Sequence, residues 1–122
     1  MAATPLTTHV LDTSSGAPAA GLTITLHWLP PADTDGGGNS PVLLSRTVTN
    51  ADGRVTGREL VPVGADWVAG TYRLRFETGP YFAPAPCFYP YAEVVFTVTD
   101  PAAHYHVPLL VAPFGYSTYR GS

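Results

Sequence analysis

The C-terminal stretch reads His104-Tyr-His-Val-Pro-Leu-Leu-Val-Ala-Pro-Phe-Gly-Tyr-Ser-Thr-Tyr-Arg-Gly-Ser122, and it predicts two strands joined by a short proline-containing turn. Successive side chains on a strand point to opposite faces, so His104 and His106 share one face. Chain ends fray unless something holds them. We therefore expect the end of this sequence, Tyr119-Arg-Gly-Ser122, to be held in place and to take part in function.

The rest of the chain continues the pattern of short strands. Apolar and polar residues alternate, as in Leu22-Thr-Ile-Thr-Leu-His-Trp28, which is typical of half-buried strands. The predicted strands are 6–12, 22–28, 42–49, a short one beginning at Arg54, one opening at Gly70, 92–98, 104–111 and 114–120. Because no segment has a long helical period, the pattern indicates an all-β sandwich of about eight strands.

Three connections carry specific signals. Asn50-Ala-Asp-Gly53 is typical of a hairpin turn. The glycine-rich stretch 30–41 predicts a flexible surface loop. Tyr81-Phe-Ala83, just before Pro84, is expected to form one helical turn.

Composition limits the classes of partner. The chain has 122 residues with no internal repeat or linker, so one domain over 1–122 is expected. Its net charge is −3 and its six basic residues are all scattered arginines, a pattern without the basic patch of a nucleic-acid-binding protein. No apolar run reaches the ~18 residues of a membrane span. Charged residues make up only 12% of the chain and apolar residues 45%, which favours a surface partly buried between subunits.

The compartment is predicted from cysteine usage and the two ends. A single cysteine, Cys87, excludes an intramolecular disulfide and favours a reducing compartment. The start, Met1-Ala-Ala-Thr-Pro5, has neither the basic nor the apolar region of a signal peptide. The end differs from the peroxisomal Ser-Lys-Leu signal. We therefore expect a cytoplasmic protein.

Histidines and arginines are the candidates for chemistry. His9, His104 and His106 lie on predicted strands, and two interpretations of them stay open. A His-x-His pair with a third histidine is a ligand set that zinc enzymes use. Alternatively, a histidine acts as general base on water while an arginine stabilises the oxyanion. The candidate arginines are Arg46, Arg54, Arg58, Arg73, Arg75 and Arg120, and Arg54 begins a strand where its side chain can aim inward.

Several motifs together resemble a known family. The opening Leu6-Thr-Thr-His-Val-Leu-Asp12 is similar to the first strand of the transthyretin superfamily. The closing His104-Tyr-His-Val-Pro-Leu-Leu110 and Tyr116-Ser-Thr-Tyr-Arg-Gly-Ser122 resemble its enzymatic branch, the 5-hydroxyisourate hydrolases. Asn50-Ala-Asp-Gly-Arg54 also matches, and the resemblance covers nearly the whole chain. It implies a sandwich of two four-stranded antiparallel sheets with one short helix.

The resemblance also implies a site and an assembly. His9, Arg54, His106 and Ser122 would be catalytic, with His9, Arg54 and Tyr119 binding substrate and His104 in a supporting or interface role. No metal or other cofactor is implied. Family members are homotetramers, dimers of dimers, with active sites in a channel between the dimers.

The reaction implied is hydrolysis of 5-hydroxyisourate to 2-oxo-4-hydroxy-4-carboxy-5-ureidoimidazoline in urate degradation. The competing interpretation is a binding module, a transthyretin-like carrier that holds a small ligand without turning it over. The sequence does not decide which histidine is the base.

Overall fold

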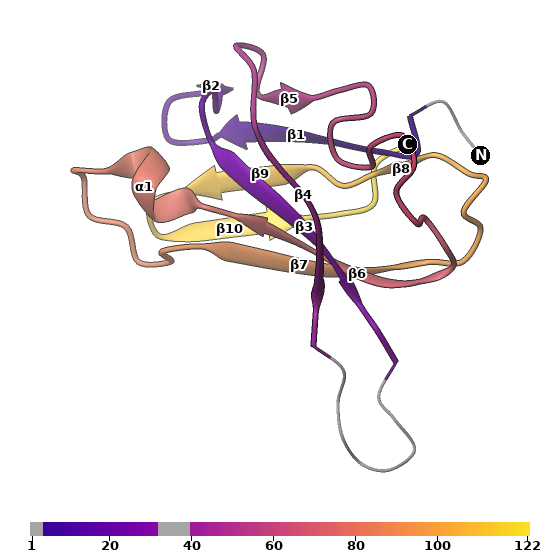
Figure 1. Cartoon of the computed structure of the whole chain (residues 1–122). Helices are drawn as coiled ribbons and strands as arrows, with labels where there is room; N and C mark the ends of the chain where they lie inside the picture. Colours follow the sequence, from indigo (N-terminus) through magenta and orange to yellow (C-terminus); the bar gives the residue numbers. More distant parts are fainter. Residues whose placement is uncertain (1–3, 32–39) are drawn as a thin grey trace.

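Two β-sheets pack face to face in the computed structural model, which describes residues 4–31 and 40–122 (Figure 1). The first sheet contains β1 (Leu6–Asp12), β2 (Ala17–Pro18), β5 (Arg54–Val55), β8 (Tyr105–His106), β9 (Leu109–Ala112) and β10 (Gly115–Thr118). The second has the order β4 (Val42–Val48), β3 (Thr23–Leu29), β6 (Gly70–Phe76) and β7 (Ala92–Val98). A short helix, α1 (Thr78–Phe82), joins β6 to β7. The predicted all-β sandwich with one short helix is confirmed.

Alternation along the strands builds the core. In β3, Ile24 and Leu26 are fully buried, and Leu26 lies opposite Leu74 of β6. Each leucine or isoleucine side chain removed from water contributes about 1.5–3 kcal/mol, so the face that carries them turns inward. The inward faces of both sheets meet in one hydrophobic cluster. The outward faces are left for polar side chains and chemistry.

The first sheet differs from the expected four antiparallel strands. β1 pairs parallel with both β8 and β9, while β2 and β5 pair antiparallel with it, so six segments form a mixed sheet. The predicted strand 104–111 is divided into β8 and β9 around Pro108, which has no N–H to donate to a ladder. Strand direction is set by the long connection between the segments, and local alternation does not encode it.

The Asn50–Gly53 turn is present, but it does not close a hairpin. β4 before it belongs to the second sheet, whereas β5 after it pairs with β1 in the first. The turn therefore carries the chain from one sheet to the other, and the hairpin prediction is wrong.

Of the predicted loop 30–41, residues 32–39 lie outside the described residues. Within the described part of the chain, no helix is long and apolar enough to cross a membrane.

Candidate active site

His9 and Arg54 lie side by side on the outer face of the first sheet. The β1–β5 register sets His9 opposite Arg54 and Thr8 opposite Val55. Thr8 and Val55 are both buried, while Arg54 is exposed and His9 is half-buried. Directly opposed residues on one face interact across strands. The prediction that Arg54 aims inward is wrong, because Val55 takes the inward position and leaves the guanidinium on the solvent side with the imidazole.

The turn before β5 sets the position of Arg54. The Asn50 side-chain oxygen accepts hydrogen bonds from the backbone N–H of Asp52 at 2.9 Å and of Arg54 at 3.0 Å. Gly53 has φ of 71°, and a Cβ there would lie 2.5 Å from the carbonyl oxygen of Val10. Glycine is the residue that tolerates both demands. The Asp-Gly-Arg sequence thus presses the start of β5 against β1.

His104 and His106 reach the same face from the other side of β1. β8 runs parallel to β1 and sets His106 opposite Thr7. The Thr7 hydroxyl oxygen lies 2.9 Å from Nδ1 of His106 and 3.3 Å from Nε2 of His104. Tyr105, between the two histidines, is buried on the inner face. The predicted shared face of the histidine pair is therefore confirmed, and Thr7 lies between the two rings.

Electrostatics connect His106 with His9 and Arg54. Partial burial lowers the pKa of His106 from its usual 6.5, and the positive charge of Arg54 lowers it further. His104 and His9 act in the same direction, against a hydrogen bond to the Thr7 backbone that raises the pKa. The lowered pKa keeps the His106 imidazole neutral, and able to accept a proton, to lower pH than a free histidine.

The C-terminal segment packs directly on His106. The backbone N–H of Gly121 donates to the carbonyl oxygen of His106 at 2.8 Å. A Cβ on Gly121 would overlap Cδ2 of the His106 ring and lie 3.1 Å from its Cγ. Ser122 follows and is exposed, and Figure 1 places the C-terminus beside β8. A larger residue at this position would therefore force the imidazole or the C-terminal segment to move.

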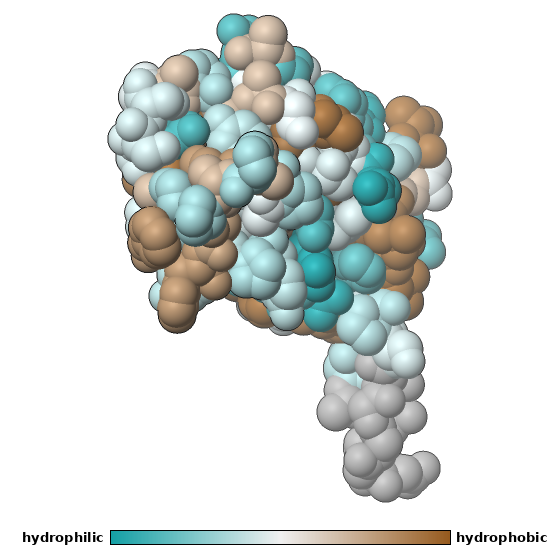
Figure 2. Space-filling model, turned by 90° about the vertical axis from the view of Figure 1, so that its left-hand side faces the viewer, coloured by the Kyte–Doolittle hydropathy of each residue, from teal (hydrophilic) through white to brown (hydrophobic). Residues whose placement is uncertain are grey.

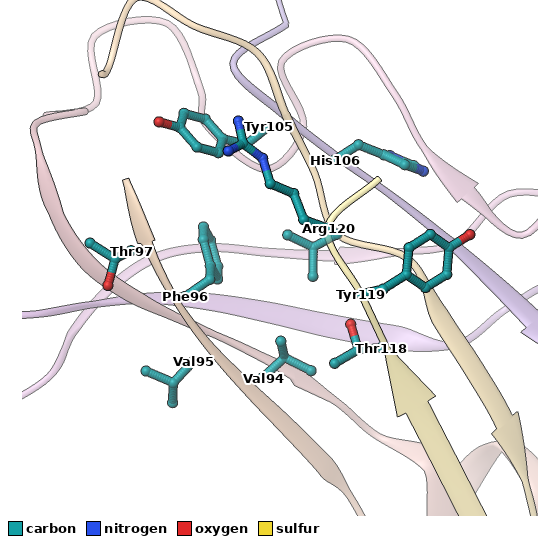
Figure 3. Close-up of a pocket in the computed structure, with 10 residues that line it drawn as sticks. Val94, Val95, Phe96, Thr97, Tyr105, His106, Thr118, Tyr119 and Arg120 are labelled. Carbon is teal, nitrogen blue, oxygen red and sulfur yellow. The ribbon is translucent and has the colours of Figure 1, made fainter. Parts of the chain in front are cut away.

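A cavity of about 340 Å³ lies next to the histidine cluster. One wall comes from Val94 to Thr97 of β7, and the other from Tyr105 to Val107 and Thr118 to Arg120. His106 and Tyr119 line it, whereas His9 and Arg54 lie outside it. In Figure 3, His106 and Tyr119 point to the same side while Arg120 turns over Tyr105, 4.8 Å from the ring centre. The cavity and the histidine–arginine face therefore meet only at His106.

Residues 4–31 and 40–122 hold no set of ligands of the kind that the zinc interpretation requires. Within these residues no group of three or more histidine, cysteine or acidic side chains is arranged to hold a metal ion. His104 and His106 each turn a ring nitrogen to the Thr7 hydroxyl. His104 and His106 are thus arranged around a shared hydrogen-bond partner, the Thr7 hydroxyl.

Two residues of this site were not predicted. Thr7 lies two positions before His9 on the same strand, so the alternation of β1 carried a signal that could have identified it. Gly121 stood within the C-terminal motif, but its contact with the His106 ring depends on how the two segments cross. The catalytic and binding roles of His9, Arg54, His106, Ser122 and Tyr119 stay predictions.

Comparisons with known proteins agree with this architecture. A model of the HIUase/Transthyretin family matches residues 6–121. The chain is 46% identical to 5-hydroxyisourate hydrolase 2 of Rhizobium meliloti (strain 1021), over 96% of this chain and 95% of that protein.

Solved structures of both an enzyme and a carrier are similar to the fold. Klebsiella pneumoniae 5-hydroxyisourate hydrolase has a TM-score of 0.74 and 38% identity, covering 98% of this chain and 99% of that one. Transthyretin from Sparus aurata has a TM-score of 0.79 and 30% identity, covering 96% of each chain. Since the backbone resembles both, site residues and not the fold must separate enzyme from carrier. The match over residues 6–121, together with these identities over nearly full length, shows that the chain belongs to the HIUase/Transthyretin family.

Proposed function

We propose that this protein hydrolyses 5-hydroxyisourate to 2-oxo-4-hydroxy-4-carboxy-5-ureidoimidazoline, opening the six-membered ring at an amide carbonyl. The proposal rests on one observation. His9, Arg54 and His106 come from three distant segments and lie together on one solvent-facing surface. The similarity to 5-hydroxyisourate hydrolases over nearly the whole chain supports the same substrate. One domain, residues 1–122, would carry the activity.

The chemistry assigned to this surface is general acid–base hydrolysis. One histidine accepts a proton from water, whose oxygen attacks the amide carbonyl carbon and leaves a tetrahedral oxyanion. The exposed Arg54 guanidinium binds the planar, oxygen-rich substrate and stabilises that oxyanion. The C–N bond then breaks as the leaving nitrogen takes a proton from the other histidine. The lowered pKa of His106 suits the role of base.

The end of the chain would complete the pocket. Tyr119 is 59% exposed and lies beside the cavity that also reaches His106. Ser122 follows Gly121, which is hydrogen-bonded to His106. We assign Tyr119 to substrate binding and Ser122 to the catalytic surface.

A single spectroscopic experiment separates the hydrolase from a carrier. 5-Hydroxyisourate is generated in the cuvette from urate with urate oxidase, and its ultraviolet absorbance is followed with and without this protein. A hydrolase accelerates the decay in proportion to protein concentration. Saturable binding of the compound with an unchanged decay rate would instead establish the carrier and overturn the proposal.

We further propose a homotetramer, a dimer of dimers. β7 and β10 are the terminal strands of their sheets and have one partner each within the described residues. Large hydrophobic side chains near them are exposed, including Val95, Phe88 and Phe114. Figure 2 shows hydrophobic residues gathered in patches on one face of the molecule. Open strand edges and apolar patches are features that association covers.

Sedimentation equilibrium tests the assembly. The expected mass is about four times the 12.9 kDa of one chain. A mass of one chain across the micromolar range would contradict the tetramer.

The use of one cysteine, Cys87, supports placing this assembly in a reducing compartment, and we propose the cytoplasm.

Gly121→Ala is expected to lower kcat/KM by about tenfold or more, because the added methyl group overlaps the His106 ring and forces one of the two segments to move. Gly115→Ala is the matched control. Gly115 lies on β10 in the same C-terminal region, and a Cβ there meets nothing within 4 Å. Equal activity of the two variants would contradict the packing of the C-terminal segment on His106.

A further inference from the structure

The Thr7 hydroxyl lies between the imidazole rings of His104 and His106. His104 and His106 are two residues apart, so their side chains project from one face about 7 Å apart along the strand. Thr7 projects from the neighbouring strand β1 between them, opposite His106. The backbone N–H of Val107 donates to the Thr7 carbonyl at 3.0 Å, which holds the strands in this register. The threonine hydroxyl is thereby within hydrogen-bond distance of both rings.

The donor and acceptor in each of these hydrogen bonds can be assigned by starting from the bond between His104 and the backbone of Thr4. Nδ1 of His104 bonds the carbonyl oxygen of Thr4. A carbonyl only accepts, so Nδ1 carries the proton and Nε2 of neutral His104 is an acceptor. The Thr7 hydroxyl therefore donates to Nε2 of His104. Having one proton to give, the same oxygen accepts from Nδ1–H of His106, and Nε2 of His106 is left without a proton.

We propose that Thr7 is a positioning residue for the hydrolysis proposed above, on which this inference rests, and that it holds His106 as the Nδ1–H tautomer with Nε2 as the general base. The β-branched side chain has few rotamers, so the hydroxyl is held in one direction. The partner of one imidazole nitrogen decides the chemistry of the other, as in enzymes where a second group orients a catalytic histidine. His106 is thus the base, and His9 is left to protonate the leaving nitrogen.

The chain of hydrogen bonds also gives the accepted proton a path. When Nε2 of His106 takes a proton from water, Nδ1 can pass its own proton to the Thr7 oxygen. The Thr7 hydroxyl proton then moves to Nε2 of His104, which is exposed at the surface. One proton leaves the water and one arrives on His104, so the transfer balances without another reactant.

Protonation of His104 reverses the direction of the hydrogen bonds that link His104, Thr7 and His106. Its Nε2–H would donate to Thr7, the hydroxyl would turn to Nδ1 of His106, and the His106 proton would move to Nε2. The groups that act on His106 are Arg54 from β5, His9 from β1 and His104 beside it, while Arg120 of the C-terminal segment turns to Tyr105. Base activity is thus lost when either His106 or His104 gains a proton.

Nitrogen NMR of the imidazole rings tests the tautomer without substrate. Two-bond ¹H–¹⁵N correlations of the wild-type protein, above the titration of both rings, are expected to show His106 protonated at Nδ1. In Thr7→Val, which keeps the branched shape and the backbone carbonyl but removes the hydroxyl, the share of the Nε2–H tautomer is expected to rise. Wild-type His106 protonated at Nε2 would overturn the inference.

Kinetics test the consequence for turnover. Thr7→Val is expected to lower kcat for 5-hydroxyisourate by about 10–100-fold with little change in KM, the size of effect typical of residues that orient a reacting group. Thr7→Ser keeps a hydroxyl and is expected to retain activity within about threefold of wild type. Thr71→Val, which removes a strand hydroxyl from the other sheet, is the control for removing a threonine hydroxyl and is expected to match wild type. Equal kcat for Thr7→Val and wild type would overturn the positioning role.

The pH profile separates positioning from mere packing. Wild-type kcat/KM is expected to fall at low pH as His106, the base, gains a proton. The Thr7 hydroxyl accepts from Nδ1–H of His106 and so favours the charged imidazole, and its removal in Thr7→Val should lower the pKa of His106 and move the acid limb to lower pH. The two failures are distinguishable: a wild-type protein that shows the Nδ1–H tautomer but does not accelerate decay of 5-hydroxyisourate refutes the proposed function and leaves the relay intact.

Discussion

His106→Ala is expected to lower turnover of freshly generated 5-hydroxyisourate by about 10²–10⁴-fold, the contribution usual for general acid–base catalysis. His106 lies at the point where the cavity, the Thr7 hydroxyl and the C-terminal segment meet. Its lowered pKa leaves it neutral and able to accept a proton from water. The measurement is the initial rate of absorbance decay at saturating substrate, with urate oxidase in excess.

The control for this variant is His27→Ala. His27 is also a strand histidine, but it lies on β3 of the second sheet, and its Nδ1 has no hydrogen-bond partner among the described residues. It should retain wild-type turnover. Circular dichroism and sedimentation establish that both variants keep the fold and assembly. Near-wild-type turnover by His106→Ala would remove His106 from the mechanism.

Arg54→Ala is expected to lower kcat/KM by about 10²–10³-fold, the loss seen when one donor to a developing oxyanion is removed. Arg54→Lys should recover only part of this loss, because an ammonium group is a point charge without the planar fork of a guanidinium. Arg46→Ala is the control, since Arg46 is exposed on β4 of the other sheet. Full activity of Arg54→Ala would contradict substrate binding by Arg54.

The Arg54 variants also predict the direction in which the pH profile of kcat/KM moves. The positive charge of Arg54 lowers the pKa of His106. Its removal in Arg54→Ala should therefore raise that pKa toward the usual 6.5, and the acid limb of kcat/KM should move to higher pH. Arg54→Lys keeps the charge, so its acid limb should stay near that of the wild type. An unmoved limb in Arg54→Ala would show that His106 and Arg54 are not coupled.

The strands were predictable because their signal is local. β1 and β7 begin and end where alternation placed them, and Gly70 opens β6 as expected. Burial of one face leaves a period of two in any stretch of five or more residues. β2, with only Ala17 and Pro18, is too short to show a period, and it was missed.

The candidate residues were predictable as motifs, but their arrangement was not. His9, Arg54 and His106 stood out in short segments, whereas the direction of Arg54 was wrongly predicted because the sequence does not show which sheet β5 joins. The parallel pairing of β1 with β8 was also unpredicted. It places Thr7 beside His106 across a separation of 99 residues.

The sequence alone determined the two-residue period that builds the sandwich and the motif residues that mark the family, since both follow from neighbours along the chain. The tertiary structure alone decided which of those residues touch. Strand pairing within the first sheet brings β5 and β8 to β1 and sets the Thr7 hydroxyl between two imidazoles, and the fold of the C-terminal segment lays Gly121 on the His106 ring. Contacts between segments about a hundred residues apart depend on burial of the whole core, and no local pattern encodes them.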